Sequence, residues 1–170
     1  MSSNDCEWGY KCFNGDFTDR YGNVIESGHI YSCDELEIKK KGYHFCKRLE
    51  DTLRYYDGLS SDVIICRVKA LGKVVTTSDE YNDYYDIGCT NIIYIGDVLS
   101  REEIIKYATG LHSIYFIRFI QGYKLLESEL EYFKDKYKNN ELVRRFISYY
   151  QEGDHDVFYN YERKLMRKIK

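Results

Sequence analysis

The chain has 170 residues and a formal net charge of −3, and 44% of its residues are hydrophobic. This length fits one domain, or one domain with a helical appendage, and the hydrophobic content is sufficient for a packed core. A mildly acidic chain is not a typical nucleic-acid binder. No run of 18 or more apolar residues predicts a membrane span, and the N-terminal residues lack a secretory signal pattern, so we expect a cytoplasmic location.

The first hundred residues are predicted to form a small sheet. Segments rich in β-branched and aromatic residues alternate there with turn signals that contain glycine and asparagine. The predicted strands are 7–13, 27–31, 43–46, 62–77 (one strand bent at Gly72, or two strands) and 90–98, with a weak alternating segment over 36–41 that Gly42 closes.

A short helix is expected directly after strand 43–46. Leu49, Thr52, Leu53 and Tyr56 recur at helical spacing, which predicts a helix over 48–57 with one buried face. Gly58 fits the end of that helix.

The remainder of the chain is predicted to be helical. Ser100 and Glu103 match a capping box, and helices are expected after Ser100 and over 114–123, 125–137, 141–151 and 157–169. Strands first and helices last indicate an α+β fold. We expect a mixed or antiparallel sheet in residues 7–99 and a helical region, 100–170, packed on it as a single globular unit.

The six cysteines are expected to be reduced and mostly buried, because the chain can build a core without disulfides and contains no C-x-x-C pair. Another interpretation is a zinc site made of Cys33, His44 and Cys46, with His29 or Cys66 as the fourth ligand. These residues lack the short paired spacing of structural zinc sites. We therefore expect no metal.

Three surface segments have both a functional and a solvated interpretation. Lys39–Lys41 with Lys47 and Arg48 could hold a phosphate, and the acidic, tyrosine-rich loop 79–86 could recognise a protein. The basic end, 163–170, could contact nucleic acid or an anionic membrane, or simply complement a helix dipole. Apart from that end, nucleic-acid binding is not expected.

Five short motifs lie between residues 9 and 99: Lys11-Cys12-Phe13, Gly28–Tyr31, Gly42–Cys46, Leu49 with Tyr55-Tyr56, and Val68–Val74. Together they resemble an uncharacterised domain of phage and giant-virus proteins, often found ahead of pentapeptide or ankyrin repeats. The resemblance implies a viral accessory protein in the host cytoplasm or the virion. It would act as a non-enzymatic interaction or ligand-binding module with a host or viral protein partner.

A second resemblance, more remote, is to the NAD-binding half of ADP-ribosyltransferases. Gly42–Phe45 is similar to the strand in which that family places a tyrosine against nicotinamide, and His44 takes the tyrosine's position. Some RNA 2′-phosphotransferases of that fold carry a histidine there. The family's first-strand histidine or arginine would fall near Tyr10 or Lys11, and neither matches.

The family's catalytic glutamate would fall near Thr90 or Asn91, and neither residue is a carboxylate. The resemblance therefore implies a nucleotide-binding or purely scaffold role more readily than transferase activity. Under the enzyme alternative the ligand is NAD or another nucleotide, and otherwise no cofactor is expected. The residues expected to bind the ligand are Lys11, Lys41, Tyr43, His44 and Asn91.

His44 is the one candidate catalytic residue. Its imidazole could stack on a base, or act as a general acid or base with a pKa near neutrality. It could equally be a packed histidine bonded to a carbonyl group. Strand alternation places it on the face opposite Tyr43 and Phe45, so the sequence leaves both interpretations open.

Overall fold

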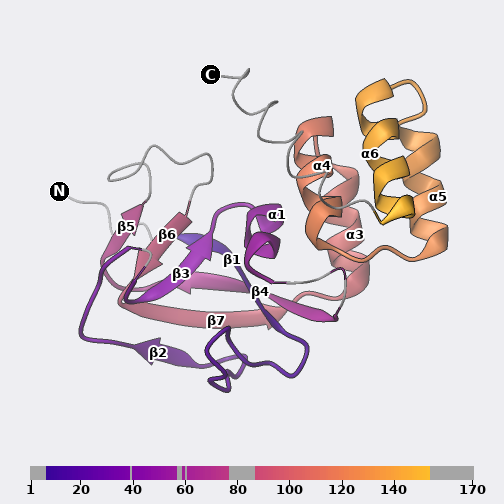
Figure 1. Ribbon diagram of the computed structural model, residues 1–170. Coiled ribbons are helices and arrows are strands. Elements are labelled where there is room, and N and C mark those ends of the chain that lie inside the picture. The colour runs from indigo at the N-terminus through magenta and orange to yellow at the C-terminus, as the bar shows by residue number, and fades with distance from the viewer. Residues whose placement is uncertain (1–6, 39, 57–58, 60, 77–86, 154–170) are drawn as a thin grey trace.

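The N-terminal part of the chain forms an antiparallel sheet and the C-terminal part forms helices (Figure 1). The structure is a computed structural model, and it describes residues 7–38, 40–56, 59, 61–76 and 87–153. The predicted α+β fold is confirmed. Several sequence predictions fall outside the described residues: the helix 157–169, the basic end 163–170, the loop 79–86, Lys39, and the helix end at Gly58.

Within the described residues the sheet has seven strands in the order β2-β7-β4-β1-β3-β6-β5, and each neighbouring pair is antiparallel. The strands are β1 (Trp8–Asn14), β2 (Ile30–Ser32), β3 (Tyr43–Cys46), β4 (Val63–Ala70), β5 (Val74–Thr76), β6 (Ile87–Thr90) and β7 (Ile92–Val98). The segment before Gly42 is not a strand, because the amides of Lys40 and Lys41 both bond to the carbonyl of Glu37 and form a turn.

A single bent hairpin gives the sheet its shape. In the register, Ala70 lies opposite Ile93 and Val74 lies opposite Thr90, so β4 and β5 run along β7 and β6. Between them, the side chain of Asn91 accepts a hydrogen bond of 2.9 Å from the amide of Lys73. The bend separates one half of the sheet, β2-β7-β4-β1, from the other, β3-β6-β5.

The two halves meet where β1 lies beside β3. Only Tyr10 and Cys46 form a register pair there, although β3 has four residues. Gly9 permits the close approach, because a Cβ at this position would lie 2.6 Å from the carbonyl oxygen of Cys46. The sparse pairing leaves space between β1 and β3 beyond that contact, and this space becomes the cleft described below.

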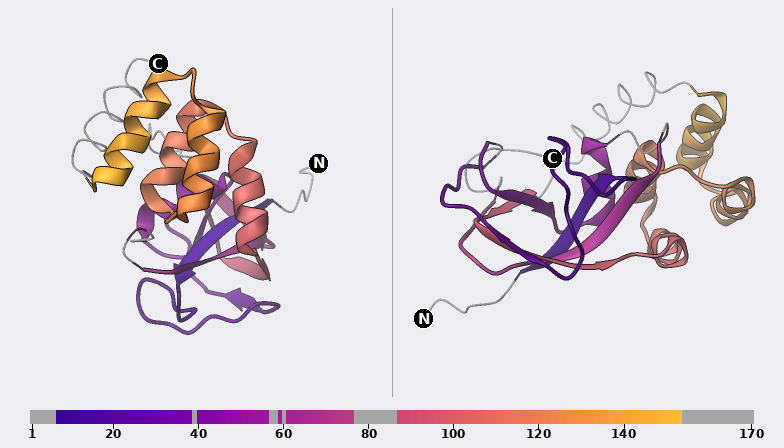
Figure 2. Two further views of the ribbon diagram at one scale, coloured as in Figure 1. Left: turned by 90° about the vertical axis from the view of Figure 1, so that its right-hand side faces the viewer. Right: turned by 90° about the horizontal axis from the view of Figure 1, so that it is seen from below.

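The helices gather at one end of the sheet (Figures 1 and 2). They are α1 (Leu49–Thr52), which continues as the 3-10 turn η1 (Leu53–Tyr55), and then α3 (Arg101–Thr109), α4 (Ser113–Gly122), α5 (Glu127–Lys136) and α6 (Glu141–Glu152). The predicted capping box is present, since Ser100 and Glu103 bond to each other's amides. No helix among the described residues has the length and apolar character needed to span a membrane.

A buried polar cluster joins α1 to the helices that follow the sheet. Glu50 and Asp51 are each only 2% exposed. Asp51 Oδ1 lies 3.2 Å from Arg118 Nη1 on α4, and the Tyr107 hydroxyl on α3 donates to Glu50 Oε2 at 2.7 Å. Arg48 Nε is 2.6 Å from the other Glu50 oxygen. Because buried charges are tolerated only when they are paired, this cluster fixes α1 against α3 and α4.

We predict that Arg118→Leu lowers the free energy of unfolding by about 3–5 kcal/mol, because Asp51 then stays buried without its cation. The double variant Arg118→Leu/Asp51→Leu should recover part of that loss. Urea denaturation measures both. Arg145→Leu, which removes an exposed pair with Glu141, is the control and should cost less than about 1 kcal/mol. An equally small effect of Arg118→Leu would contradict the conclusion that the buried polar cluster fixes α1 against α3 and α4.

Candidate ligand-binding cleft

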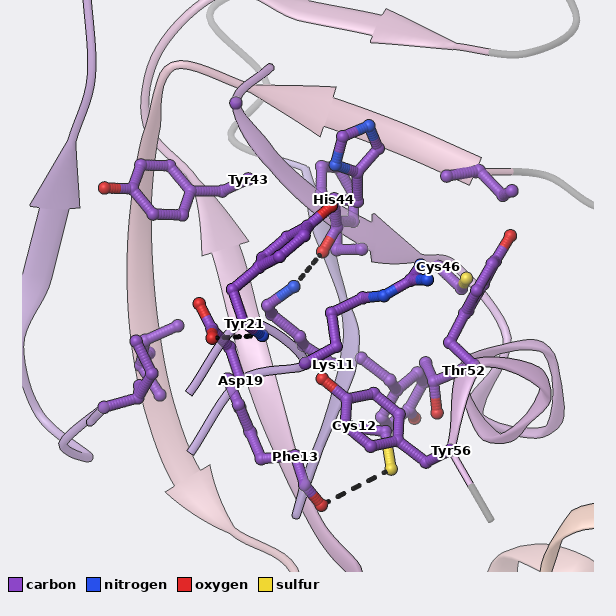
Figure 3. Close-up of a pocket in the computed structure, with 18 of the residues that line it drawn as sticks. Lys11, Cys12, Phe13, Asp19, Tyr21, Tyr43, His44, Cys46, Thr52 and Tyr56 are labelled. Carbon is purple, nitrogen blue, oxygen red and sulfur yellow. Dashed lines mark hydrogen bonds between the residues drawn. The ribbon is translucent and has the colours of Figure 1, made fainter. Parts of the chain in front are cut away.

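A cleft of about 570 Å³ opens between β1 and β3 (Figure 3). Most of its lining residues come from 10–13 of β1, 42–46 of β3 and its preceding turn, the loop between β1 and β2, and 52–56 other than Leu53. Tyr31, Cys33, Ile87 and Ile95 complete the wall. A volume of this size falls within the range of small-molecule sites, roughly 300–1,000 Å³.

Lys11 is the central cation of the cleft. Its side chain points between the strands, and Nζ donates a hydrogen bond of 2.8 Å to the carbonyl oxygen of His44 (Figure 3). Burial lowers the pKa of Lys11 below its ordinary value. Among the described residues, no carboxylate oxygen lies within 4.0 Å of Nζ. An ammonium group has three N–H donors, so Lys11 has donor capacity beyond its bond to His44.

The cleft is cationic although the chain is acidic. Lys11, Arg20 and Arg54 line it, and Asp19 is the one carboxylate among its described lining residues. Asp19 is engaged by the loop: it accepts hydrogen bonds from the amide of Tyr21 at 2.8 Å and from the amide and side chain of Asn23 at 2.9 and 2.8 Å. Burial works to raise the pKa of Asp19, but these bonds and the charge of Lys11 hold it below its ordinary value.

Aromatic side chains make up much of the remaining wall. Six tyrosines line the cleft: Tyr10, Tyr21, Tyr31, Tyr43, Tyr55 and Tyr56. Tyr21 is 77% exposed and Tyr55 is 39% exposed, so both present ring surface to solvent. Aromatic faces of this kind stack on planar rings.

His44 lies in the wall of the cleft and is partly buried. Burial, reinforced by the charges of Lys11 and Arg20, lowers its pKa to about 4, although a backbone hydrogen bond at Gly42 acts in the opposite direction. One of the two interpretations of His44 was a general acid or base with a pKa near neutrality, and the other was a packed histidine. The structure differs from the first, because β3 holds the imidazole in a cationic, partly desolvated site where the neutral form is favoured.

The structure brings together three of the five residues expected to bind a ligand. Lys11, Tyr43 and His44 line the cleft, whereas Lys41 and Asn91 do not. Lys41 forms an ion pair with Glu35, and the Asn91 side chain holds the hairpin bend.

Sequence reasoning missed the Arg20 and Arg54 side chains. Each arginine is followed by a tyrosine, and both members of each pair line the cleft. The repeated Arg-Tyr pair was the one sequence signal that could have indicated these residues. The two copies lie more than thirty positions apart, so the sequence gives no sign that they meet in one cleft.

The cysteines form neither a metal site nor disulfides in the described part of the chain. Cys12, Cys33, Cys46, Cys66 and Cys89 are free thiols there, and no group of three or more His, Cys, Asp or Glu side chains is placed to hold a metal ion. The zinc set of Cys33, His44 and Cys46 is therefore not formed. Burial and the nearby Asp51 raise the pKa of the Cys46 thiol, which keeps it protonated.

We predict that His44 makes the free energy of unfolding depend on pH below neutrality. Between its ordinary pKa of 6.5 and its folded pKa of about 4, the unfolded chain binds a proton that the folded chain does not. The free energy of unfolding should therefore fall as pH falls through this window. His44→Gln should remove roughly 1–3 kcal/mol of that fall. Urea denaturation at pH 7 and pH 4.5 tests this, and equal losses in the variant and the wild type would contradict it.

The cleft lies within a region shared with other proteins. A family model described as a domain of unknown function, DUF7666, matches residues 8–107. This span exceeds half of the chain and includes all strands of the sheet and every residue described in the cleft wall. No curated protein and no solved structure matches the chain. The sequence analysis expected an uncharacterised domain over about the same residues, and the chain belongs to the DUF7666 family.

Proposed function

We propose that this protein is a non-enzymatic module that binds a small anionic ligand of the nucleotide class in the cleft. The observation that carries the proposal is the environment of the Lys11 side chain. Its ammonium group is desolvated and bonded to one carbonyl oxygen, and no carboxylate among the described residues pairs with it. A buried charge is costly unless it is paired. A phosphate group bound at Lys11 would supply a counter-charge in direct contact, in addition to the more distant Asp19 carboxylate.

The rest of the wall supports a ligand with both an anionic and an aromatic part. Arg20 and Arg54 add two further cations, and guanidinium groups match phosphate geometry. Two of the lining tyrosines, Tyr21 and Tyr55, are exposed and offer ring faces on which a base can stack. A nucleotide combines these two chemistries in one molecule.

The groups in the cleft favour binding over catalysis. A general base must be able to take up a proton near the working pH, whereas the pKa of His44 is lowered to about 4. At the position where ADP-ribosyltransferases carry their glutamate, the Thr90 hydroxyl bonds to the carbonyl of Ile92 and Asn91 holds the bend. Neither Thr90 nor Asn91 lines the cleft, and Asp19 is the one carboxylate among its described lining residues.

The second candidate is an enzyme similar to ADP-ribosyltransferases or RNA 2′-phosphotransferases, with NAD or another nucleotide bound around His44. The observation in its favour is that His44 shares the cleft with Lys11 and Arg20, a grouping suited to phosphate chemistry. Nicotinamide release from NAD separates the two functions. We expect none, and release that is lost in His44→Ala would establish the enzyme.

We also propose a viral setting, in the host cytoplasm or the virion, with a host or viral protein as partner. The motifs between residues 9 and 99 support it, as does the abundance of tyrosine, with 19 residues, because tyrosine codons are AT-rich as in many giant-virus genomes. Mass spectrometry of infected cells and purified virions tests this setting. Expression only in uninfected cells would contradict it.

Titration calorimetry with AMP, ADP and NAD tests the binding function. Wild type should bind at least one of them, and Lys11→Met should weaken that binding by about tenfold or more, because it removes a charge-assisted hydrogen bond. Thermal denaturation should show that Lys11→Met unfolds close to the wild-type temperature, because the variant no longer buries a charge but also loses the hydrogen bond to the carbonyl oxygen of His44.

Lys106→Met is the matched control, because Lys106 is an exposed lysine of α3 outside the cleft. Its affinity for each nucleotide should equal that of wild type. Absence of binding to wild type by all three nucleotides would refute the proposed function. So would a Lys11→Met variant that binds as tightly as the control.

A further inference from the structure

We propose that the cleft selects ligands with two separate phosphate groups, one held by Lys11 inside and the second held at the mouth by Arg20 and Arg54. This inference rests on the proposed function and specifies its ligand. It assigns the ligand to the nucleoside diphosphates and dinucleotides, which contain a phosphoanhydride, in preference to nucleoside monophosphates.

The loop between β1 and β2 holds Arg20 in place before any ligand arrives. The Asp19 carboxylate accepts three hydrogen bonds from Tyr21 and Asn23, so residues 19–23 form a closed turn. The side chain of Asn14, the last residue of β1, donates to the carbonyl oxygen of Asp19 at 3.1 Å and to Thr18 Oγ1 at 3.1 Å. The turn that carries Arg20 is thus tied to the strand that carries Lys11.

Arg20 reaches from this loop toward η1. Its guanidinium carbon lies 5.7 Å from the ring centre of Tyr21 and 6.0 Å from that of Tyr55. Tyr55 is the residue after Arg54, and all four side chains line the cleft. Arg20 and Arg54 are both exposed, whereas Lys11 is partly buried. The three cations therefore form an inner position at Lys11 and an outer position at the mouth.

The opposite side of the mouth is also fixed. The turn η1 follows α1, whose carboxylates Glu50 and Asp51 are held by the buried polar cluster. Leu53 packs against α4 so closely that a Cβ at Gly122 would lie 2.6 Å from the Leu53 Cβ. The backbone that carries Arg54 therefore belongs to an element packed against the helices, whereas the Arg54 side chain itself is exposed.

Two positions of positive charge favour two anions. A monophosphate can compensate Lys11, but it offers no second anionic group to the arginines that line the mouth. A second phosphate linked to the first can reach the mouth while the first stays inside. Arginine forks bind phosphate oxygens in pairs, so the outer position should contribute strongly to affinity.

Calorimetry with AMP, ADP and NAD on the full chain tests this selectivity. Wild type should bind ADP about tenfold more tightly than AMP. Arg20→Gln and Arg54→Gln should each lower the affinity for ADP more than that for AMP, and so reduce the ratio of the two affinities. Lys11→Met should weaken both nucleotides by similar factors and leave the ratio near its wild-type value.

Arg144→Gln removes an exposed arginine of α6 outside the cleft and is the matched control. Its ratio of ADP affinity to AMP affinity should equal that of wild type. Circular dichroism confirms that each variant is folded. Equal affinities for AMP and ADP in wild type, or equal losses of both in Arg20→Gln, would overturn this inference and leave the proposed function standing. If wild type binds none of the three nucleotides, both fail.

Discussion

The hydrogen bond from Lys11 Nζ to the carbonyl oxygen of His44 is the contact on which the cleft depends. It spans the place where β1 and β3 lie side by side but share a single register pair, Tyr10 with Cys46. A side chain thus takes the place of a main-chain ladder between the two halves of the sheet. The cost is a positive charge in a partly desolvated site, and this cost is what an anionic ligand would offset.

The helices contribute to the cleft indirectly. None of the residues described in α3–α6 lines it, yet α3 and α4 hold the buried carboxylates of α1 through Tyr107 and Arg118. The turn η1, which continues α1, carries Arg54 and Tyr55 into the wall. The polar cluster between the helices therefore determines where one side of the mouth lies.

Local patterns were enough to predict much of the fold. Strand 43–46 is confirmed residue for residue, the capping box at Ser100 is present, and α6 begins at Glu141 as predicted, with Asn140 as its cap. The two caps rest on contacts between residues three positions apart, and strand 43–46 has a local sequence signal in its run of aromatic and hydrophobic residues after Gly42. Strand β6 was missed because it has only four residues, Ile87–Thr90, and follows an acidic stretch without alternation. The sequence placed its last strand at 90–98, across the bend that Asn91 makes.

The site was harder to predict than the fold, because long-range packing assembles it. Lys11 and His44 come from two strands, and their contact follows from the register of β1 with β3. Arg20 lies in an irregular loop whose course over the cleft depends on the hydrogen bonds of Asp19 and Asn14. Asn91 has a polar side chain of the kind that binds ligands, but this side chain is hydrogen-bonded to the amide of Lys73 at the hairpin bend. The hydrophobic periodicity of the sequence does not indicate which of these long-range contacts a polar side chain makes.

A crystal structure of the protein grown with ADP tests the central claim most directly. The account predicts a phosphate oxygen at about 2.7–3.0 Å from Lys11 Nζ, with the lysine still bonded to the carbonyl of His44. A nucleotide bound elsewhere on the molecule, with Lys11 in contact only with protein atoms, would contradict it.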